Sequence, residues 1–565
     1  MHPEVAARLE RLDPEQRAAA TAPEGPVLCL APAGAGKTTT LVARIAFRVD
    51  RGVPPDRVCA IAFNRRAAEE LEERVDAALE PLGVAPGTVR VRTFHALGLE
   101  ILRSAGRTVE PIVDRDVVLR VTFPDAPPEL LRRLDTTISR LKLDAGVSAA
   151  DVEADPEPGP VGEAFLAYER ALAATGGLDF DDLVARSLAA LESDAPLLER
   201  WHASCAELLV DEVQDVDRAQ LRLALLLAAP ENRIFLVGDD DQSIYGWRLA
   251  DVRRVLGIAD ALPGLRRVDL ETNYRCPEPV VERSVRLVER NVERFAKRVR
   301  PRPEACGRLV LAPDGDDDTE RIGRAFDTWP EDASTRALLT PTNRELVPGI
   351  AVALDRELPF RAARVRLLVE APELDPLLEH AAATDASLPL LVRLGSLRDG
   401  PEPRLPTEGG LPHAAPVPCG RSAGAIGRAD PLEPAPDTVS HAELICALLG
   451  WAVPFDDLDD LVVAIQDQRA RLARLRSDDA PLSFATAHST KGLEFDHVVV
   501  LMDASRFPSP RALADALEPG RALEEERRLA YVAWTRARRS LTLLYDPVEP
   551  SPFLLEAFTA DELGL

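Results

Sequence analysis

Lysine is almost absent from this chain. Of 68 basic residues in 565, only four are lysines, Lys37, Lys142, Lys297 and Lys491, and the rest are arginines. A compact ammonium fits between phosphate oxygens where a planar guanidinium does not, so the two residue types are not interchangeable. Lys37 lies in a glycine-rich pattern, and we predict that it is retained there for phosphate binding. We interpret Lys142 and Lys297 as surface lysines without a special role.

Cysteine is also scarce, and no long apolar run is present. The seven cysteines are scattered, odd in number and without a Cys-x-x-Cys pair, which fits reduced thiols and gives no support for a zinc or iron–sulfur site. Residues 1–10 carry no apolar signal segment. The stretch Leu221 to Ala229, which is apolar apart from Arg222, is too short to cross a membrane and predicts a buried helix. We therefore expect a cytoplasmic protein with no membrane partner.

The formal net charge of −26 excludes a chain coated in basic surface. It leaves nucleic acid open as a partner, because phosphate contacts need only a local basic groove. It predicts weak non-specific binding that fades quickly as salt rises. With 46% hydrophobic residues and this length, the chain can form several domains, each with its own core.

Short apolar runs followed by helical patterns recur in two sets, which is typical of parallel sheets with crossover helices. Between the third and fourth strands of the first set, helical spacing predicts an inserted helical domain, and the second set is interrupted between roughly Glu370 and Pro481. The first set comprises Val27 to Ala31, Val58 to Phe63, Val89 to Thr93, Glu207 to Val210 and Ile234 to Val237. The second comprises Arg308 to Ala312, Ala337 to Thr340, Leu482 to Thr486, His497 to Met502 and Ser540 to Tyr545.

A phosphate-loop pattern follows the first predicted strand. The residues Ala31 to Thr38 read Ala-Pro-Ala-Gly-Ala-Gly-Lys-Thr and open a predicted helix. At such a loop, backbone N–H groups and the N-terminus of a helix surround the phosphates of a nucleotide. Lys37 is predicted to contact the β- and γ-phosphates, and the Thr38 hydroxyl is predicted to bind Mg²⁺. A plain glycine turn is the alternative, and the flanking strand and helix disfavour it. The predicted nucleotide-binding backbone comprises Ala33, Gly34, Ala35, Gly36, Lys37, Thr38 and Thr39.

An acidic pair follows the strand Glu207 to Val210. Asp211 and Glu212 therefore emerge at the carboxyl end of a strand, where parallel sheets bind ligands. Asp211 is predicted to hold Mg²⁺, directly or through water, and Glu212 to accept a proton from the attacking water. A solvated charge pair is the alternative, and the phosphate loop makes it the weaker one.

Five further motifs complete an ordered set of seven. The whole set resembles the superfamily-one DNA helicases of the UvrD, Rep and PcrA type, and the resemblance spans nearly the whole chain. Two departures from that family are Pro32, which removes an N–H donor from the phosphate loop, and Asn64 to Arg66. The five further motifs are Leu12 to Gln16, Val237 to Arg248, Asn273 to Arg275, His488 to Phe495 and Tyr531 to Ala537.

The resemblance implies roles around the nucleotide. Arg275 and Arg536 match the family's two arginine positions, which place positive charge on the γ-phosphate as its bond breaks. Gln242 is expected to hydrogen-bond the γ-phosphate and to count, with Lys37, Glu212 and the two arginines, among the catalytic residues. Tyr274 is similar to the family residue that stacks on adenine. Gln16 is similar to the one that contacts the edge of the adenine, and Glu494 is similar to the one near the ribose.

Contacts with DNA are expected to be separate from the nucleotide site but coupled to it. Tyr245 and Trp247 follow Gln242 and offer flat faces on which bases stack without regard to sequence. Trp534 lies where the family often has a smaller residue, and we interpret it as part of a core. The remaining predicted DNA-binding residues are Phe63, Thr93, Phe94, His95, Arg248 and His488.

The fold class expected from the resemblance is α/β, with two RecA-like parallel-sheet domains, an ATP cleft between them, and an insertion in each. The stretch Gly400 to Thr438 is dense in proline and glycine and predicts a flexible linker, with a few helices in Ser440 to Arg476. The predicted boundaries are 1–95 and 205–272 for the first domain, 96–204 for its helical insertion, 273–370 and 480–550 for the second domain, 371–479 for its reduced insertion with linker 400–438, and 551–565 for a tail.

These observations predict an ATP- and Mg²⁺-dependent motor on single-stranded DNA and single-strand/double-strand junctions. By resemblance it moves 3′-to-5′, unwinds duplex and works in DNA repair or recombination. We expect a monomer when purified, with repair proteins as partners. Alternatives are a translocase with little unwinding of its own, a subunit acting with a partner nuclease, a small-molecule kinase, and a non-enzymatic DNA-binding scaffold. A kinase would not need the segment Gln242 to Trp247, so that alternative leaves the segment unexplained. A scaffold that does not hydrolyse ATP would not need Glu212, Arg275 and Arg536.

Overall fold

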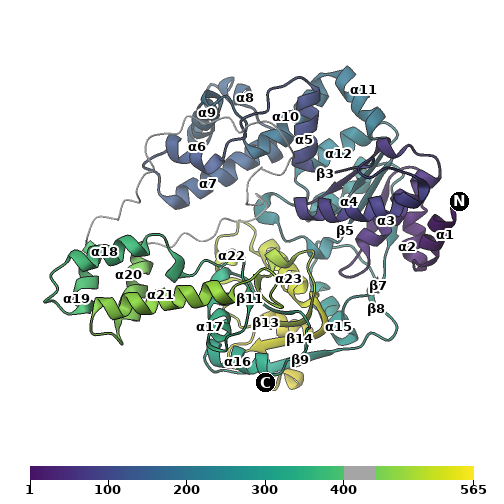
Figure 1. The fold of residues 1–565 in the computed structure, drawn as a ribbon. Helices are drawn as coiled ribbons and strands as arrows, with labels where there is room; N and C mark the ends of the chain where they lie inside the picture. The colour runs from purple at the N-terminus through teal and green to yellow at the C-terminus, as the bar shows by residue number, and fades with distance from the viewer. Residues whose placement is uncertain (400–440) are drawn as a thin grey trace. The chain divides into compact units, whose positions relative to one another are not determined.

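The computed structural model describes residues 1–399 and 441–565, so the predicted linker Gly400 to Thr438 lies outside the described residues. The chain divides into two compact units (Figure 1). The first comprises Met1–Arg308, Phe507–Arg538 and Pro552–Thr559. The second comprises Leu309–Arg506, Arg539–Ser551 and Ala560–Leu565.

The first unit contains a six-stranded sheet in the order β3-β2-β4-β5-β1-β6, and all neighbouring strands are parallel. Every residue of β1, β2, β4 and β5 is buried, as expected where helices cover both faces of a parallel sheet. The five predicted strands are therefore confirmed, and the exposed, arginine-rich edge strand β6 was not predicted. The bounds are β1 Val27–Leu30, β2 Val58–Ala62, β3 Arg90–Thr93, β4 Glu207–Val210, β5 Ile234–Gly238 and β6 Arg266–Asp269.

Helices pack on both faces of this sheet and form two hydrophobic cores. The predicted buried helix at Leu221 to Ala229 corresponds to α12 (Arg218–Ala228), where Leu223 and Leu227 are buried. Other helices near the sheet are α1 (Pro3–Glu10), α2 (Pro14–Ala20), α3 (Lys37–Asp50), α4 (Arg65–Leu79), α13 (Val252–Leu256) and α14 (Ile258–Ala261).

The segment between β3 and β4 is helical, in agreement with the predicted insertion. Part of it has a small core of its own that includes Phe165, Tyr168 and Leu172. Its helices are α5 (Phe94–Ser104), α6 (Arg115–Thr122), α7 (Pro128–Ser139), α8 (Ala149–Glu153), α9 (Gly159–Ala174), α10 (Phe180–Ser193) and α11 (Ala195–Ser204).

The remainder of the first unit is built around α23 (Pro519–Trp534). Its residues Glu526 to Trp534 are all buried, and Trp534 is 0% exposed, which confirms its interpretation as core. The accompanying elements are α15 (Glu278–Val288), α22 (Pro510–Ala514), α24 (Pro552–Ala557) and the parallel pair β7 (Thr272–Asn273) and β8 (Arg300–Pro301).

The second unit contains a six-stranded sheet in the order β11-β12-β10-β13-β14-β9. The pairs β10–β12, β10–β13 and β11–β12 are parallel, so both predicted parallel-sheet units are confirmed. Its strands are β9 (Arg308–Pro313), β10 (Arg336–Thr340), β11 (Phe360–Arg361), β12 (Leu482–Thr486), β13 (Phe495–Leu501) and β14 (Ala537–Tyr545). Helices α16 (Asp318–Asp327) and α17 (Val347–Asp355) pack against this sheet, and the Tyr545 hydroxyl of β14 donates to the carbonyl oxygen of Leu563 in α25 (Ala560–Leu563).

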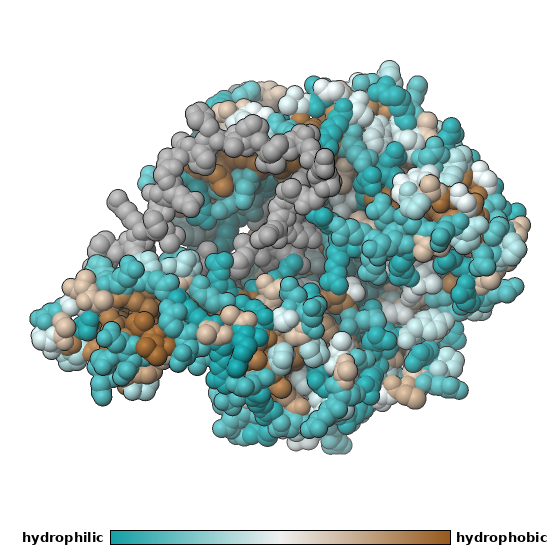
Figure 2. Space-filling model, viewed as in Figure 1, coloured by the Kyte–Doolittle hydropathy of each residue, from teal (hydrophilic) through white to brown (hydrophobic). Residues whose placement is uncertain are grey.

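The interruption of the second unit forms a small helical core. It joins α18 (Leu374–Ala383), α19 (Leu390–Gly395), α20 (His441–Ala452) and the first part of α21 (Leu458–Leu475). Figure 2 shows a mainly hydrophilic surface in which apolar residues gather over these helices. Within the described ranges, no helix has the length and apolar character that a bilayer crossing requires.

Candidate nucleotide and nucleic-acid site

The phosphate loop is shaped by two glycines with left-handed backbones. Gly34 and Gly36 have φ of +70° and +80°. A Cβ on Gly34 would lie 2.7 Å from Cβ of Arg275, and one on Gly36 would lie 2.6 Å from Nε2 of Gln16. Glycine is therefore needed at both positions for space as well as for conformation. The loop ends where α3 begins, at Lys37, so the N-terminus of a 14-residue helix faces the loop.

The predicted acidic pair lies beside this loop. Nζ of Lys37 is 3.3 Å from Oε1 of Glu212, and the N–H of Asp211 donates to the carbonyl oxygen of Ile61 in β2. Glu212 has φ 52° and ψ 45°, a left-handed conformation that is uncommon for a residue with a side chain and that concentrates at functional sites. The structure thus brings Lys37 and Glu212 together across the carboxyl ends of the strands.

Gln214, which is not among the predicted site residues, connects the acidic pair to the next motif. Its Nε2 donates to Oε2 of Glu212 at 2.5 Å, and its Oε1 accepts from the N–H of Asp239 at 3.0 Å. A Cβ on Gly238 would lie 2.2 Å from this Oε1, so the glycine at the end of β5 makes room for the amide. Only the spacing Asp-Glu-x-Gln-Asp could have drawn attention to Gln214.

Arg536 and Arg275 bring positive charge to the same place. Arg536 is 1% exposed, and its Nη2 donates to Oε1 of Gln242, whose Nε2 donates to Asp239. Burial and the neighbouring charge of Arg275 lower the pKa of Arg536 to about 9. Nη1 of Arg275 donates to the carbonyl oxygen of Thr535. Two neighbouring guanidinium groups in a low-dielectric environment favour the binding of an anionic ligand.

The residues predicted to contact the nucleoside lie against the phosphate loop. Nε2 of Gln16 donates to the carbonyl oxygen of Ala35 at 2.9 Å, and the N–H of Tyr274 donates to that of Gly34 at 2.9 Å. The Tyr274 hydroxyl donates to Oδ2 of Asp13 at 2.7 Å. Burial and this bond raise the pKa of Tyr274 to about 12. Tyr274 as a whole residue remains 40% exposed, so its side chain is accessible for stacking.

Aromatic side chains form a strip next to Gln242. The rings of Phe63 and Tyr245 are stacked with centroids 5.0 Å apart, and Tyr245 meets Trp247 edge-on at 6.1 Å. The guanidinium of Arg248 lies 4.8 Å from the ring centroid of Trp247. Tyr245 is buried, whereas Trp247 is 42% exposed, so Trp247 is the more accessible of these two aromatic side chains.

A second aromatic pair consists of His95 and Phe180, with ring centroids 4.5 Å apart. Burial lowers the pKa of His95 to about 4, so its imidazole is neutral at pH 7. Phe180, at the start of α10, was not predicted, although an aromatic between aspartates in a polar segment is a recognisable signal. Phe94 is 4% exposed and packs in the hydrophobic core, and its predicted contact with DNA stays a prediction. The Thr93 hydroxyl accepts from the N–H of Ala96 and caps α5.

Comparisons with known proteins agree with this geometry. Residues 12–263 match the model of the UvrD/REP helicase N-terminal domain, and residues 458–546 match the UvrD-like helicase C-terminal domain. Together the two matches cover more than half of the chain. It belongs to the UvrD/REP helicase family.

Two relatives are proteins called ATP-dependent DNA helicase PcrA. The one from Staphylococcus aureus (strain Mu50) is 33% identical over 306 residues, and the one from Staphylococcus epidermidis (strain ATCC 12228) is 32% identical over 306 residues. Each alignment covers 52% of this chain and 42% of the relative. The chain is thus matched to less than half the length of these UvrD/REP-family relatives.

The interpretation of Lys297 as a surface lysine is wrong. Its side chain is 1% exposed, and its Nζ lies 2.5 Å from Asp239, 2.5 Å from Asp240 and 3.0 Å from Asp241. Burial alone would lower the pKa of Lys297, but the three carboxylates raise it well above its usual value. The acids lie more than 50 residues away in sequence, so composition could not reveal the pairing. In this UvrD/REP-family chain, Lys297 fixes the acidic run directly before Gln242.

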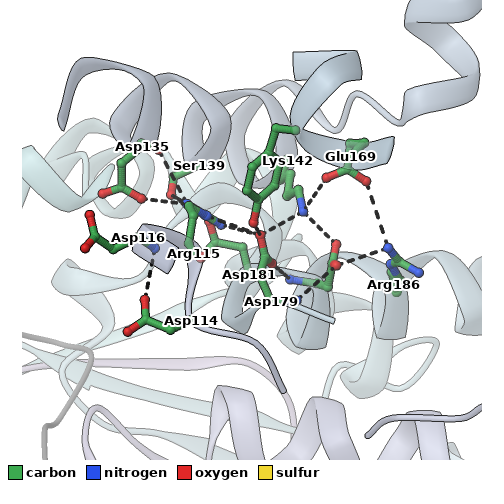
Figure 3. A network of polar contacts seen from close by, with 12 residues as sticks. Asp114, Arg115, Asp116, Asp135, Ser139, Lys142, Glu169, Asp179, Asp181 and Arg186 are labelled. Atoms are coloured by element: carbon green, nitrogen blue, oxygen red, sulfur yellow. Dashed lines mark hydrogen bonds and ion pairs between the residues drawn. The ribbon is translucent and has the colours of Figure 1, made fainter. Parts of the chain in front are cut away.

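The interpretation of Lys142 is wrong for a similar reason. Nζ of Lys142 lies 2.7 Å from Glu169, 2.9 Å from Asp179 and 3.0 Å from Asp182 (Figure 3). Arg115 also contacts Asp179, at 2.8 Å. Burial alone would raise the pKa of Asp179, but these two cations lower it overall. The network holds the start of α10, where Phe180 lies.

The remaining predicted site residues lie in different parts of the two units. The Thr39 hydroxyl accepts from Arg74 at 3.0 Å on the exposed side of α3. His488 and Glu494 lie in the second unit, in the segment between β12 and β13. Burial lowers the pKa of His488 to about 4. The roles of these residues, and of Thr38 and Asp211 toward Mg²⁺, stay predictions.

Proposed function

We propose that this protein is an ATP-dependent DNA helicase that translocates along single-stranded DNA. One observation carries the proposal: a continuous set of polar contacts runs from Lys37 through Glu212, Gln214 and Asp239 to Gln242. Gln242 lies three residues before the aromatic strip. Nucleotide chemistry and base stacking therefore share one rigid segment of the first unit.

The nucleotide chemistry follows from the residues that surround the phosphate loop. Lys37 and the backbone N–H groups of the loop bind the phosphates, and Glu212 accepts a proton from the attacking water. Arg275 and Arg536 stabilise the charge that develops on the γ-phosphate. The Thr38 hydroxyl and the Asp211 carboxylate are oxygen donors of the kind that Mg²⁺ prefers, and they would hold the ion. Mg²⁺ bound there neutralises charge on the phosphates.

DNA binding is supported by the aromatic strip. Trp247 offers an exposed face, Tyr245 and Phe63 lie behind it, and Arg248 adds positive charge beside its ring. Base stacking on aromatic residues ignores sequence, which suits a protein that moves along a strand. His95 and Phe180 form a second surface for the nucleic acid.

Movement in the 3′-to-5′ direction, unwinding at single-strand/double-strand junctions and work in cytoplasmic DNA repair are proposed from the family. A translocase with little unwinding of its own is the second candidate, because the sequence of the second insertion is dense in proline and glycine over Gly400 to Thr438. The same purified protein should be tested in three assays: ATPase with and without single-stranded DNA, strand displacement, and streptavidin displacement from labelled strands. Absence of any stimulation by single-stranded DNA would contradict the proposal. Streptavidin displacement without strand displacement would favour the translocase.

A further inference from the structure

We propose that Glu525 is a positioning residue that links DNA contact at Trp247 to the arginine that faces the γ-phosphate, Arg536. The inference rests on the proposed function and goes beyond it, because no role in the reaction has so far been given to the N-terminal half of α23. The link is the hydrogen bond from the N–H of Gly246 to Oε1 of Glu525, at 2.8 Å.

The contact between Glu525 and Gly246 is unusually close. An added Cβ on Gly246 would lie 2.4 Å from Oε2 and 2.8 Å from Oε1 of Glu525. Gly246 is the first residue of the short 3-10 turn Gly246–Arg248, which presents Trp247 to solvent. The carboxylate therefore lies against the backbone of the turn itself, and glycine is required there to let it approach. Any displacement of Trp247 that moves the turn acts directly on Glu525.

The other end of the same helix contacts the nucleotide machinery. Arg536, two residues after α23, donates to Gln242, and the carbonyl oxygen of Thr535 accepts from Arg275. Gln242 and Gly246 are four residues apart, so α23 and the residues that follow it contact both ends of one short segment. A helix rises about 1.5 Å per residue, so the distance along α23 from Glu525 to its end is about 14 Å. A rigid helix of this length can carry a displacement from the aromatic turn to Arg536.

The surroundings of Glu525 hold it in place. Burial raises the pKa of Glu525, while its bond from Gly246 and the charges of Arg528 and Arg521 oppose that rise. Arg521 is itself fixed between Asp251, at 2.9 Å, and Glu293, at 3.0 Å. The carboxylate thus contacts the turn from a firmly anchored part of α23. Helix and turn are expected to move together.

Four variants test the coupling. Glu525→Ala removes the acceptor, whereas Glu525→Gln retains an oxygen that can accept from Gly246. Gly246→Ala displaces the carboxylate sterically, and it should be combined with Glu525→Ala in a double variant. The matched control is Glu526→Gln, on the same helix, where a buried glutamate accepts from the N–H of Ser509.

The readout is the ratio of ATPase rates with and without saturating single-stranded DNA, measured together with DNA affinity and thermal stability. We expect the ratio to fall about tenfold in Glu525→Ala, within the 5–150-fold range of coupling between two sites. Glu525→Gln and Glu526→Gln should keep a ratio near that of the wild type. The double variant should lose no more than the larger single loss, because both changes break one contact.

Several outcomes would overturn the inference. One is an unchanged ratio in Glu525→Ala, and another is an equal loss in Glu525→Ala and Glu525→Gln. A parallel fall of both rates with a lowered melting temperature would show a purely structural role, as would additive losses in the double variant. If the wild type itself showed no DNA stimulation, the proposed function would fail together with the coupling. A stimulated wild type with an insensitive Glu525→Ala would remove the coupling alone.

Discussion

Nη2 of Arg536 donates a hydrogen bond to Oε1 of Gln242 at 3.1 Å. The same Gln242 donates to Asp239, which Gln214 ties to Glu212 and which Lys297 holds by an ion pair. A buried arginine and a buried glutamine thus connect the proposed γ-phosphate site to the segment that carries Trp247. In a low-dielectric interior such polar contacts are strong when complete and costly when one member is lost. The site should therefore respond as a unit to single substitutions.

Substitution of the proposed general base should separate binding from turnover. Glu212→Gln retains the side chain's size and its contact with Gln214 but cannot accept a proton from water. We expect ATP turnover to fall by about 10²-fold or more, since general-base catalysis contributes ~10²–10⁴. Nucleotide affinity should remain close to that of the wild type in a fluorescent-nucleotide titration. Lys37→Ala should lower both ATP turnover and nucleotide affinity. Glu69→Gln, at an exposed position on α4, is the control, and wild-type turnover in Glu212→Gln would contradict the assigned role.

Removal of the exposed aromatic should weaken the response to DNA. Trp247→Ala deletes the stacking face but leaves Tyr245 and Phe63 in place. Base stacking contributes about 1–3 kcal/mol, so the DNA concentration for half-maximal ATPase stimulation should rise by about 5–150-fold. Trp247→Phe keeps a flat ring and should recover much of the loss. An equal shift in both variants would show that stacking is not the interaction.

The stretch Gly400 to Thr438 should be dispensable for hydrolysis, because the sequence motifs of the nucleotide site lie outside it. Replacement by a short glycine/serine linker should leave DNA-stimulated ATPase activity within a factor of a few, since loop length affects stability only weakly. Strand displacement can change in either direction. An insoluble or inactive replacement protein would show that the stretch is structural.

Much of the fold could be predicted because its signals are local. The strands β1, β2, β4 and β5 are short, continuous apolar runs, and burial on both faces leaves little ambiguity about them. The edge strand β6 reads Arg-Arg-Val-Asp and carries no such signal. The phosphate loop and the acidic pair could likewise be placed, because both follow predicted strands directly.

The rest of the site depends on contacts between distant residues. Glu525 and Gly246 are 279 residues apart, and Arg536 and Gln242 are 294 apart. Nothing in the local sequence of α23 distinguishes Glu525, which accepts from the turn, from its glutamate neighbours on either side. For Phe94, a motif match predicts a contact with DNA, and only the fold shows that its side chain packs in the hydrophobic core.

The burial of Lys297 leads to a prediction about stability. Lys297→Met retains most of the apolar length of the side chain but leaves three neighbouring aspartates without their shared cation. Breaking a buried ion pair by removing one partner costs about 3–5 kcal/mol. We expect a loss of that order in urea unfolding at pH 7. Arg253→Met is the control, because the Arg253 side chain is 52% exposed and its ion pair with Asp251 is a surface one.

The same variant should depend on pH in a definite direction. Burial and the charges of the neighbouring aspartates already raise the pKa of Asp240, and Lys297 opposes this rise, so its removal should raise the pKa of Asp240 in the folded state further above the unfolded-state value. A carboxyl group with a raised folded-state pKa destabilises the fold at high pH, and this penalty disappears as the pH falls and the group takes up a proton. The difference in unfolding free energy between Lys297→Met and the wild type should therefore shrink between pH 7 and pH 5. A difference that stayed constant, or grew on acidification, would show that Lys297 acts through packing and that its charge contributes little.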